Sequence, residues 1–178
     1  MYAICDEMWN SVDIYGPQGE IDRFKRLFIG PAPAGNRSRS TMAFKLEDLS
    51  AEYAWNFREL GPHEHGMYSF AFDTLANFPD YAFEELTGIF PRLHFDCECI
   101  ADDDHRMGYG WFNTPPGGQD FRDDYNVPED YWNGGIGKRA EPELRRHMMV
   151  VDALRQRLRD EERGGRGATL RNVADDPR

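Results

Sequence analysis

Residues 93–113, LHFDCECIADDDHRMGYGWFN, decide the fold because they predict two strands joined by a polar turn. In the first eight residues apolar and polar side chains alternate, which is the period of a strand with one buried face. The next six, ADDDHR, form the turn, and the last seven return as a second strand whose glycines allow close backbone approach. We expect one face of this hairpin to be buried. The polar positions of its first strand, on the opposite face, are His94, Asp96 and Glu98.

The chain before this hairpin alternates between strand and helix patterns. Residues 9–15 predict a strand, and residues 18–28 carry apolar side chains at helical spacing. Residues 53–57 and 67–73 predict two more strands, and residues 78–90 predict a second helix. This order is the split βαβ arrangement of ferredoxin-like folds. We therefore expect an α+β protein with two helices packed on one sheet.

The remaining segments add to this predicted domain, which spans residues 1–118. Residues 29–41 (IGPAPAGNRSRST) predict a mobile loop, because Gly, Pro and Ser dominate without an apolar period. Residues 119–140 predict an irregular extension packed on the domain, residues 141–163 a last helix, and residues 164–178 a disordered tail. The narrow apolar stripe of the last helix consists of Leu144, Met148, Val151, Leu154 and Leu158. This stripe is a possible surface for self-association.

The charge of the chain limits its partners. The chain has 178 residues, enough for one domain of ordinary size. Its 21 basic and 32 acidic residues give a net charge of -11. From Glu141 onward there are 9 basic and 8 acidic residues, so the preceding part carries -12. Such a surface repels phosphate backbones, and we expect no direct binding to nucleic acid. The apolar runs are also far shorter than the roughly 20 residues of a membrane span.

The cysteines and the first residues indicate a cytoplasmic protein. Cys5, Cys97 and Cys99 are an odd number without a paired framework, which fits a reducing compartment. The first residues include an acid and lack the basic start and apolar stretch of a secretory signal. We expect no export.

Three segments resemble the ferredoxin-like domain of the Api92-like and YubB-like proteins, which occur on plasmids, phages and other mobile elements. They are residues 9–16 (WNSVDIYG) with the helix that follows, residues 72–79 (FDTLANFP), and the hairpin of residues 93–113. The family's middle strand usually carries Trp-Gly and Lys-Trp elements, whereas this chain has WNFR at residues 55–58. The resemblance implies the fold and a mobile-element setting. It implies no activity, because the family has no generally established one.

Two polar clusters raise the alternative of a metal-binding protein or metal-dependent enzyme. His63 and His65 offer two imidazoles beside Pro62, but no third ligand stands at a known spacing. The second cluster comprises Asp102, Asp103, Asp104 and His105. It lacks the residue spacing and the distant Glu of a calcium-binding loop. A solvated loop and a charged hairpin turn are the simpler interpretations.

Other motifs predict structure more than chemistry. Cys97 and Cys99 share one face of a strand, where burial suits them better than redox activity. Residues 134–138 (GGIGK) lack the spacer and the Ser or Thr of a phosphate loop. No set of Ser, His and acid is recognisable. We therefore expect a protein that is not an enzyme and that needs no cofactor.

The sheet face turned away from the helices is the expected functional surface. Aromatic side chains supply buried area in an interface, and carboxylates attract a basic partner. The residues expected to bind are Trp9, Asp13, Asp96, Glu98, Asp102, Asp103, Asp104 and Trp111. The expected partner is a basic or nucleic-acid-binding host protein, and a sharper version makes the chain a nucleic-acid mimic that inhibits host defence. The alternative is that the extension and the last helix fold back over this face.

Overall fold

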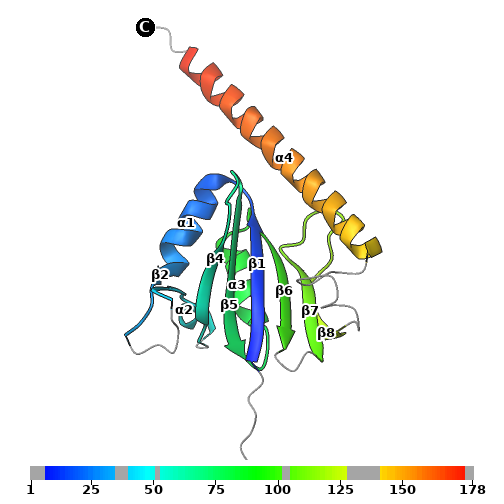
Figure 1. Ribbon diagram of the computed structural model, residues 1–178. Coiled ribbons are helices and arrows are strands. Elements are labelled where there is room, and N and C mark those ends of the chain that lie inside the picture. Colours follow the sequence, from blue (N-terminus) through cyan, green and yellow to red (C-terminus); the bar gives the residue numbers. More distant parts are fainter. Residues whose placement is uncertain (1–6, 35–39, 51–52, 102–104, 128–140, 175–178) are drawn as a thin grey trace, which may run out of the picture.

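The computed structural model describes residues 7–34, 40–50, 53–101, 105–127 and 141–174 (Figure 1). It is an α+β fold with a six-stranded, mostly antiparallel sheet. In chain order the elements are β1 (Glu7–Tyr15), α1 (Gln18–Phe28), β2 (Ile29–Pro31), β3 (Met42–Phe44), α2 (Glu47–Ser50), β4 (Trp55–Leu60), β5 (Met67–Leu75), α3 (Asp80–Ile89), β6 (His94–Ala101), β7 (Arg106–Phe112), β8 (Arg122–Asn126) and α4 (Glu141–Ala174). None of the described helices has a stretch apolar and long enough to cross a bilayer.

The large sheet has the strand order β4-β5-β1-β6-β7-β8, and each neighbouring pair is antiparallel. β1 therefore lies inside the sheet, between β5 and β6. Its residue Asp13 faces Ser69 on one side and Asp96 on the other. β2 and β3 form a separate two-stranded ribbon.

The main core lies between one face of the large sheet and the helices α1 and α3. Alternate residues of the strands point into it, among them Val12 of β1, Phe70 of β5 and Phe95 of β6, as the period of two requires. Phe24 of α1 is fully buried at its centre. The aromatic rings around Phe24 belong to Phe28, Phe44, Tyr68, Phe70, Phe90 and Phe95.

The structure differs from the sequence prediction in three segments. Ile29–Pro31 is a strand, because Ile29 is buried at the end of α1 and pairs with Phe44. The extension expected to be irregular contains β8, whose Tyr125 stacks on Tyr109 of β7 at 4.8 Å between centroids. The helix α4 continues to Ala174, past its predicted end, and residues 175–178 lie outside the described part.

The glycines of β7 allow close backbone approach, as predicted, and the segment before and within β8 makes that approach. A Cβ atom on Gly108 would lie 2.4 Å from the Cα of Asp123. A Cβ atom on Gly110, whose φ is +140°, would lie 2.3 Å from the carbonyl oxygen of Asp120. Side chains at these two positions would push the following chain off the sheet.

The position of Phe24 leads to a test of the core. Replacing Phe24 with Ala leaves a large cavity among the rings, and we expect the free energy of unfolding to fall by about 3–5 kcal/mol. Leu27 of the same helix is 45% exposed, so Leu27→Ala is the matched control, with an expected change within about 0.5 kcal/mol. Urea denaturation followed by circular dichroism measures both. Equal losses in the two variants would contradict this account of the core.

Candidate functional site

The opposite face of the sheet carries the residues that the sequence places there. Trp9 pairs with Ile100, and Ser11 pairs with Glu98. Phe95, Cys97 and Cys99 of β6 lie in the main core, so Asp96 and Glu98 between them point to this opposite face. Tyr109 and Trp111 of β7 lie directly across from Glu98 and Asp96. The predicted assignment of the two faces is confirmed.

The helix α4 crosses this opposite face and covers one part of it (Figure 1). Its apolar side chains form a second, smaller core with one residue each from β1, β5 and β7. The helix contributes Val150, Val151, Leu154 and Leu158, and the sheet contributes Tyr15, Met67 and Trp111. Three residues of the predicted apolar stripe are thus buried within the chain. Leu144 and Met148, the other two, are exposed.

Polar side chains connect α4 to the sheet along its length. The His147 imidazole lies 3.0 Å from the buried Asp96 carboxylate, and its ring stacks on Trp111 at 5.7 Å between centroids. The hydroxyl of Tyr109 donates a hydrogen bond of 2.6 Å to Glu143. Near the other end of the sheet, the Nε2 atom of His65 lies 3.1 Å from Glu162 of α4, and Glu64 lies 3.7 Å from Arg155 of the same helix. These contacts place α4 diagonally, from the middle of β7 to the β4–β5 turn.

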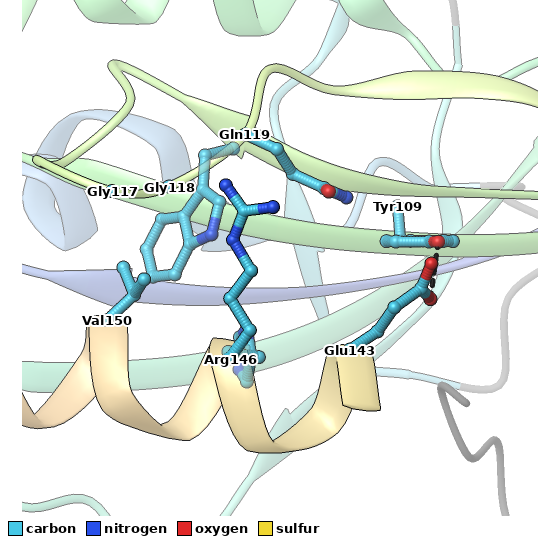
Figure 2. A pocket seen from close by; sticks show the side chains of 9 residues that line it. Tyr109, Gly117, Gly118, Gln119, Glu143, Arg146 and Val150 are labelled. Atoms are coloured by element: carbon cyan, nitrogen blue, oxygen red, sulfur yellow. Dashed lines mark hydrogen bonds between the residues drawn. The ribbon is translucent and has the colours of Figure 1, made fainter. Parts of the chain in front are cut away.

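A small hollow lies between the first turns of α4 and β7 (Figure 2). Glu143 and Arg146 reach from the helix toward the strands, with Glu143 at the Tyr109 hydroxyl. The lining residues are Tyr109, Trp111, Gly117, Gly118, Gln119, Glu143, Arg146, His147 and Val150. The hollow encloses about 80 Å³, which is room for a few water molecules and far below the usual size of a small-molecule site. We therefore place the candidate functional surface elsewhere.

A second hollow, of about 200 Å³, adjoins His63 and His65. The Glu59 carboxylate beside it accepts a 2.8 Å hydrogen bond from Tyr68 and lies 3.3 Å from the Lys25 ammonium. The hydrogen bond from Tyr68 is the main cause that lowers the pKa of Glu59, although burial opposes it. The His63 ring packs against Tyr68 in a tilted arrangement, at 4.9 Å between centroids, and His65 turns toward α4. The two imidazoles are therefore engaged in separate contacts.

The end of the sheet that α4 leaves uncovered carries two tryptophans on either side of an acid. Trp9 of β1 and Trp55 of β4 both pair with Asp73 of the intervening strand. The Trp55 Nε1 donates a 2.5 Å hydrogen bond to Glu7, which lies on the same face of β1 as Trp9. Trp9 is 41% exposed, and Leu75, opposite Glu7, is 56% exposed. We call Glu7, Trp9, Trp55, Asp73 and Leu75 the tryptophan surface.

The local structure of β4 brings Trp55 onto this surface. The register of β4 against β5 shifts between Trp55 and Arg58, and Asn56 has a φ of +50°. This irregularity lets Asn56 donate a 2.7 Å hydrogen bond to the buried Asp73 carboxylate, which Arg58 also contacts at 3.1 Å. Two donors thus hold Asp73 in place between the tryptophans.

The structure separates the residues that the sequence grouped as a partner site. Trp9 is on the uncovered end, Asp13 and Glu98 are half-buried, and Asp96 and Trp111 are buried beneath α4. Asp102, Asp103 and Asp104 lie outside the described residues, as does the GGIGK segment. Sequence reasoning missed Trp55, Asp73 and Glu7. The sequence did place Trp55 in a short predicted strand. The register shift in β4, however, means that simple alternation along the strand does not predict which face of the sheet Trp55 lies on.

The metal alternative gains no support from the residues that the structure describes. Among them, no three His, Cys, Asp or Glu side chains come together as metal ligands would. Cys97 and Cys99 are buried free thiols, as predicted, and burial raises the pKa of Cys99 to about 12. A thiol held in that state is a poor nucleophile.

His94 is a buried, titratable contact of α4. Its Nδ1 lies 2.5 Å from the carbonyl oxygen of Asn113, and its Nε2 accepts a hydrogen bond of 3.0 Å from Arg157. Accepting that bond requires a neutral ring. Burial lowers the pKa of His94 from its ordinary 6.5, as does the charge of Arg157, whereas the bond to Asn113 and the charge of Glu161 oppose them.

These contacts predict a pH dependence of stability. Because folded His94 binds a proton more weakly than unfolded His94, its contribution to stability is full above pH 6.5 and is lost as the pH falls toward the lowered pKa. In His94→Gln the amide oxygen can still accept from Arg157 but does not titrate. We expect the wild type to lose more unfolding free energy than this variant between about pH 7.5 and pH 5, measured by urea denaturation. Parallel curves would contradict this role of His94.

No protein-family model, curated protein or solved structure matches this chain. The resemblance to the Api92-like family stays an expectation from the sequence.

Proposed function

We propose that this protein is a non-enzymatic binding factor whose tryptophan surface binds a cationic segment of a partner protein. The observation that carries the proposal is the row Trp55, Asp73, Trp9 on the uncovered end of the sheet, with Glu7 bonded to the Trp55 indole. Trp9 is exposed and Trp55 is half-buried, and aromatic rings beside carboxylates are suited to cations.

The chemistry of the row favours arginine in the partner. Neighbouring strands lie 4.7–4.9 Å apart, so Trp9 and Trp55, two strands apart, are separated by about 10 Å at their backbones. A guanidinium group is planar and stacks on an indole ring, and the negative charge beside the rings adds attraction. Lysine offers a compact charge without the stacking. Two arginines at suitable spacing would fill both tryptophan positions.

The charge of the chain supports the same partner. The net charge of -11 attracts a basic protein from a distance and raises its association rate. Arg58 lies beside the row and is paired with Asp73 at 3.1 Å. The apolar Leu75 at the edge adds area that a partner would bury.

The proposal also includes a ferredoxin-like fold, a mobile-element origin and a cytoplasmic location. A ferredoxin-like core is supported by the order of β4, β5, β1 and β6 and by α1 and α3 in one core with them. The mobile-element setting rests on the sequence resemblance, and a cytoplasmic location rests on the cysteines. Mimicry of nucleic acid is a version in which the cationic segment is the partner's nucleic-acid site.

Binding of labelled peptides tests the proposal. We expect the protein to bind an arginine-rich peptide more tightly than a lysine-rich one, and not to bind an acidic one, as measured by fluorescence anisotropy. Trp9→Ala removes one cation–π contact, so we expect affinity for the arginine peptide to fall about 5- to 30-fold. Tyr81→Ala is the control, because Tyr81 is an exposed aromatic on α3.

Two results would count against the proposal. One is an affinity that Trp9→Ala leaves unchanged. The other is a difference between arginine and lysine peptides that persists in Trp9→Ala, since the tryptophan surface would then not be its source.

A further inference from the structure

The helix α4 extends beyond the sheet that supports it (Figure 1). Toward the end of its docked part, Glu161 lies 3.7 Å from Arg92, and Glu162 lies 3.1 Å from His65. Residues 163–174 follow, and at 1.5 Å per residue they extend about 18 Å farther. We call these residues the distal arm. A Cβ atom on Gly164 would meet nothing within 4 Å, so there is open space beside this residue at the start of the arm.

The distal arm differs in charge from the rest of the chain. Its sequence, RGGRGATLRNVA, has three arginines and no acid. Removing these three charges from the net -11 leaves -14 for the remaining residues. The arginines are Arg163, Arg166 and Arg171. The arm is therefore a cationic segment of the kind that the tryptophan surface is proposed to bind.

The arm also has little reason to be helical by itself. Three of its twelve residues are glycine, and each glycine costs a helix about 1 kcal/mol relative to alanine. Arg163 pairs with Asp160 one turn earlier, at 3.9 Å, with its side chain 78% exposed. Docking on another surface would stabilise the helical conformation of these residues.

The arm cannot reach the tryptophan surface of its own chain while α4 stays docked. The helix passes from Tyr109 at its start to His65 at the end of the sheet where β1 finishes at Tyr15. The tryptophan surface lies at the other end of β1, beside Glu7, roughly 25–30 Å away along a nine-residue strand. The arm points away from it.

We infer that the distal arm of a second copy of this chain docks on the tryptophan surface. The arm and the surface lie at opposite ends of one molecule, so two copies packed in opposite directions can exchange both contacts around a two-fold axis. The expected assembly is a dimer in which each copy contributes arginines to the other's site. This inference rests on the proposed function, because it uses the same surface.

Sedimentation velocity of the full chain tests the inference. We expect the wild type to have about twice the chain mass of 20.6 kDa at micromolar concentration. Both Trp9→Ala and the triple variant Arg163→Gln, Arg166→Gln, Arg171→Gln should sediment as monomers. Arg159→Gln is the control, because Arg159 lies on the docked part of α4 and contacts Gln156 at 3.3 Å.

Mixing the two monomeric variants sharpens the test. Trp9→Ala keeps the arm and the triple variant keeps the tryptophan surface, so together they can form one arm-to-surface contact. We expect the mixture to contain a heavier species that neither variant forms alone. A mixture that stays monomeric would overturn the exchange, as would a dimer that both variants leave intact.

The peptide experiment separates this inference from the proposed function. A wild type that is monomeric at all concentrations but binds the arginine peptide through Trp9 would overturn the self-recognition and leave the proposed function standing. A dimer that depends on Trp9 and the arm, in a protein that binds no free arginine peptide, would overturn the general cation-binding function and support the contact between copies.

Discussion

The pairing of β1 with both β5 and β6 is the constraint on which the other features depend. It places Val12 of β1 beside the core residues of both neighbours and turns Trp9 and Asp13 to the other face. A shift of one residue in either ladder would exchange the two faces and expose the aromatic core. Trp9 therefore lies on the outer face because the residues that alternate with it along β1 point into the core formed with α1 and α3.

The docking of α4 divides the outer face into two parts with different roles. Where the helix lies, Trp111 and Asp96 become interior groups, and they stabilise the helix through His147. Where it does not lie, Trp9 remains exposed. One helix thus completes a small second core and defines the size of the remaining surface. The interface between α4 and the sheet also contains several polar contacts. One of them is the hydrogen bond from Arg157 to the buried His94, whose ring must stay neutral to accept it.

The candidate site was predictable only in part. Trp9 follows from the alternation of a regular strand, and the acidic surroundings follow from composition. The face of Asp73 follows from the regular alternation of β5. The face of Trp55 does not, because a register shift in β4 and the positive φ of Asn56 interrupt the pattern that would assign it. Trp111 was correctly placed on the outer face, but whether a helix covers it depends on a segment more than thirty residues away.

The sequence by itself determined the order of the main strands and helices, the face to which each regular strand residue points, and the sign of the charge. The order of the elements and the faces of the strands follow from the spacing of apolar residues along the chain, because the backbone geometry of a helix or strand fixes the direction in which each side chain points. Only the tertiary structure decided which part of the sheet α4 covers, that Trp9 and Trp55 flank Asp73, and that the distal arm leaves at the opposite end. Those features arise from contacts between segments far apart in the chain. Packing and loop geometry decide which segments meet, and the pattern of apolar residues within one segment does not.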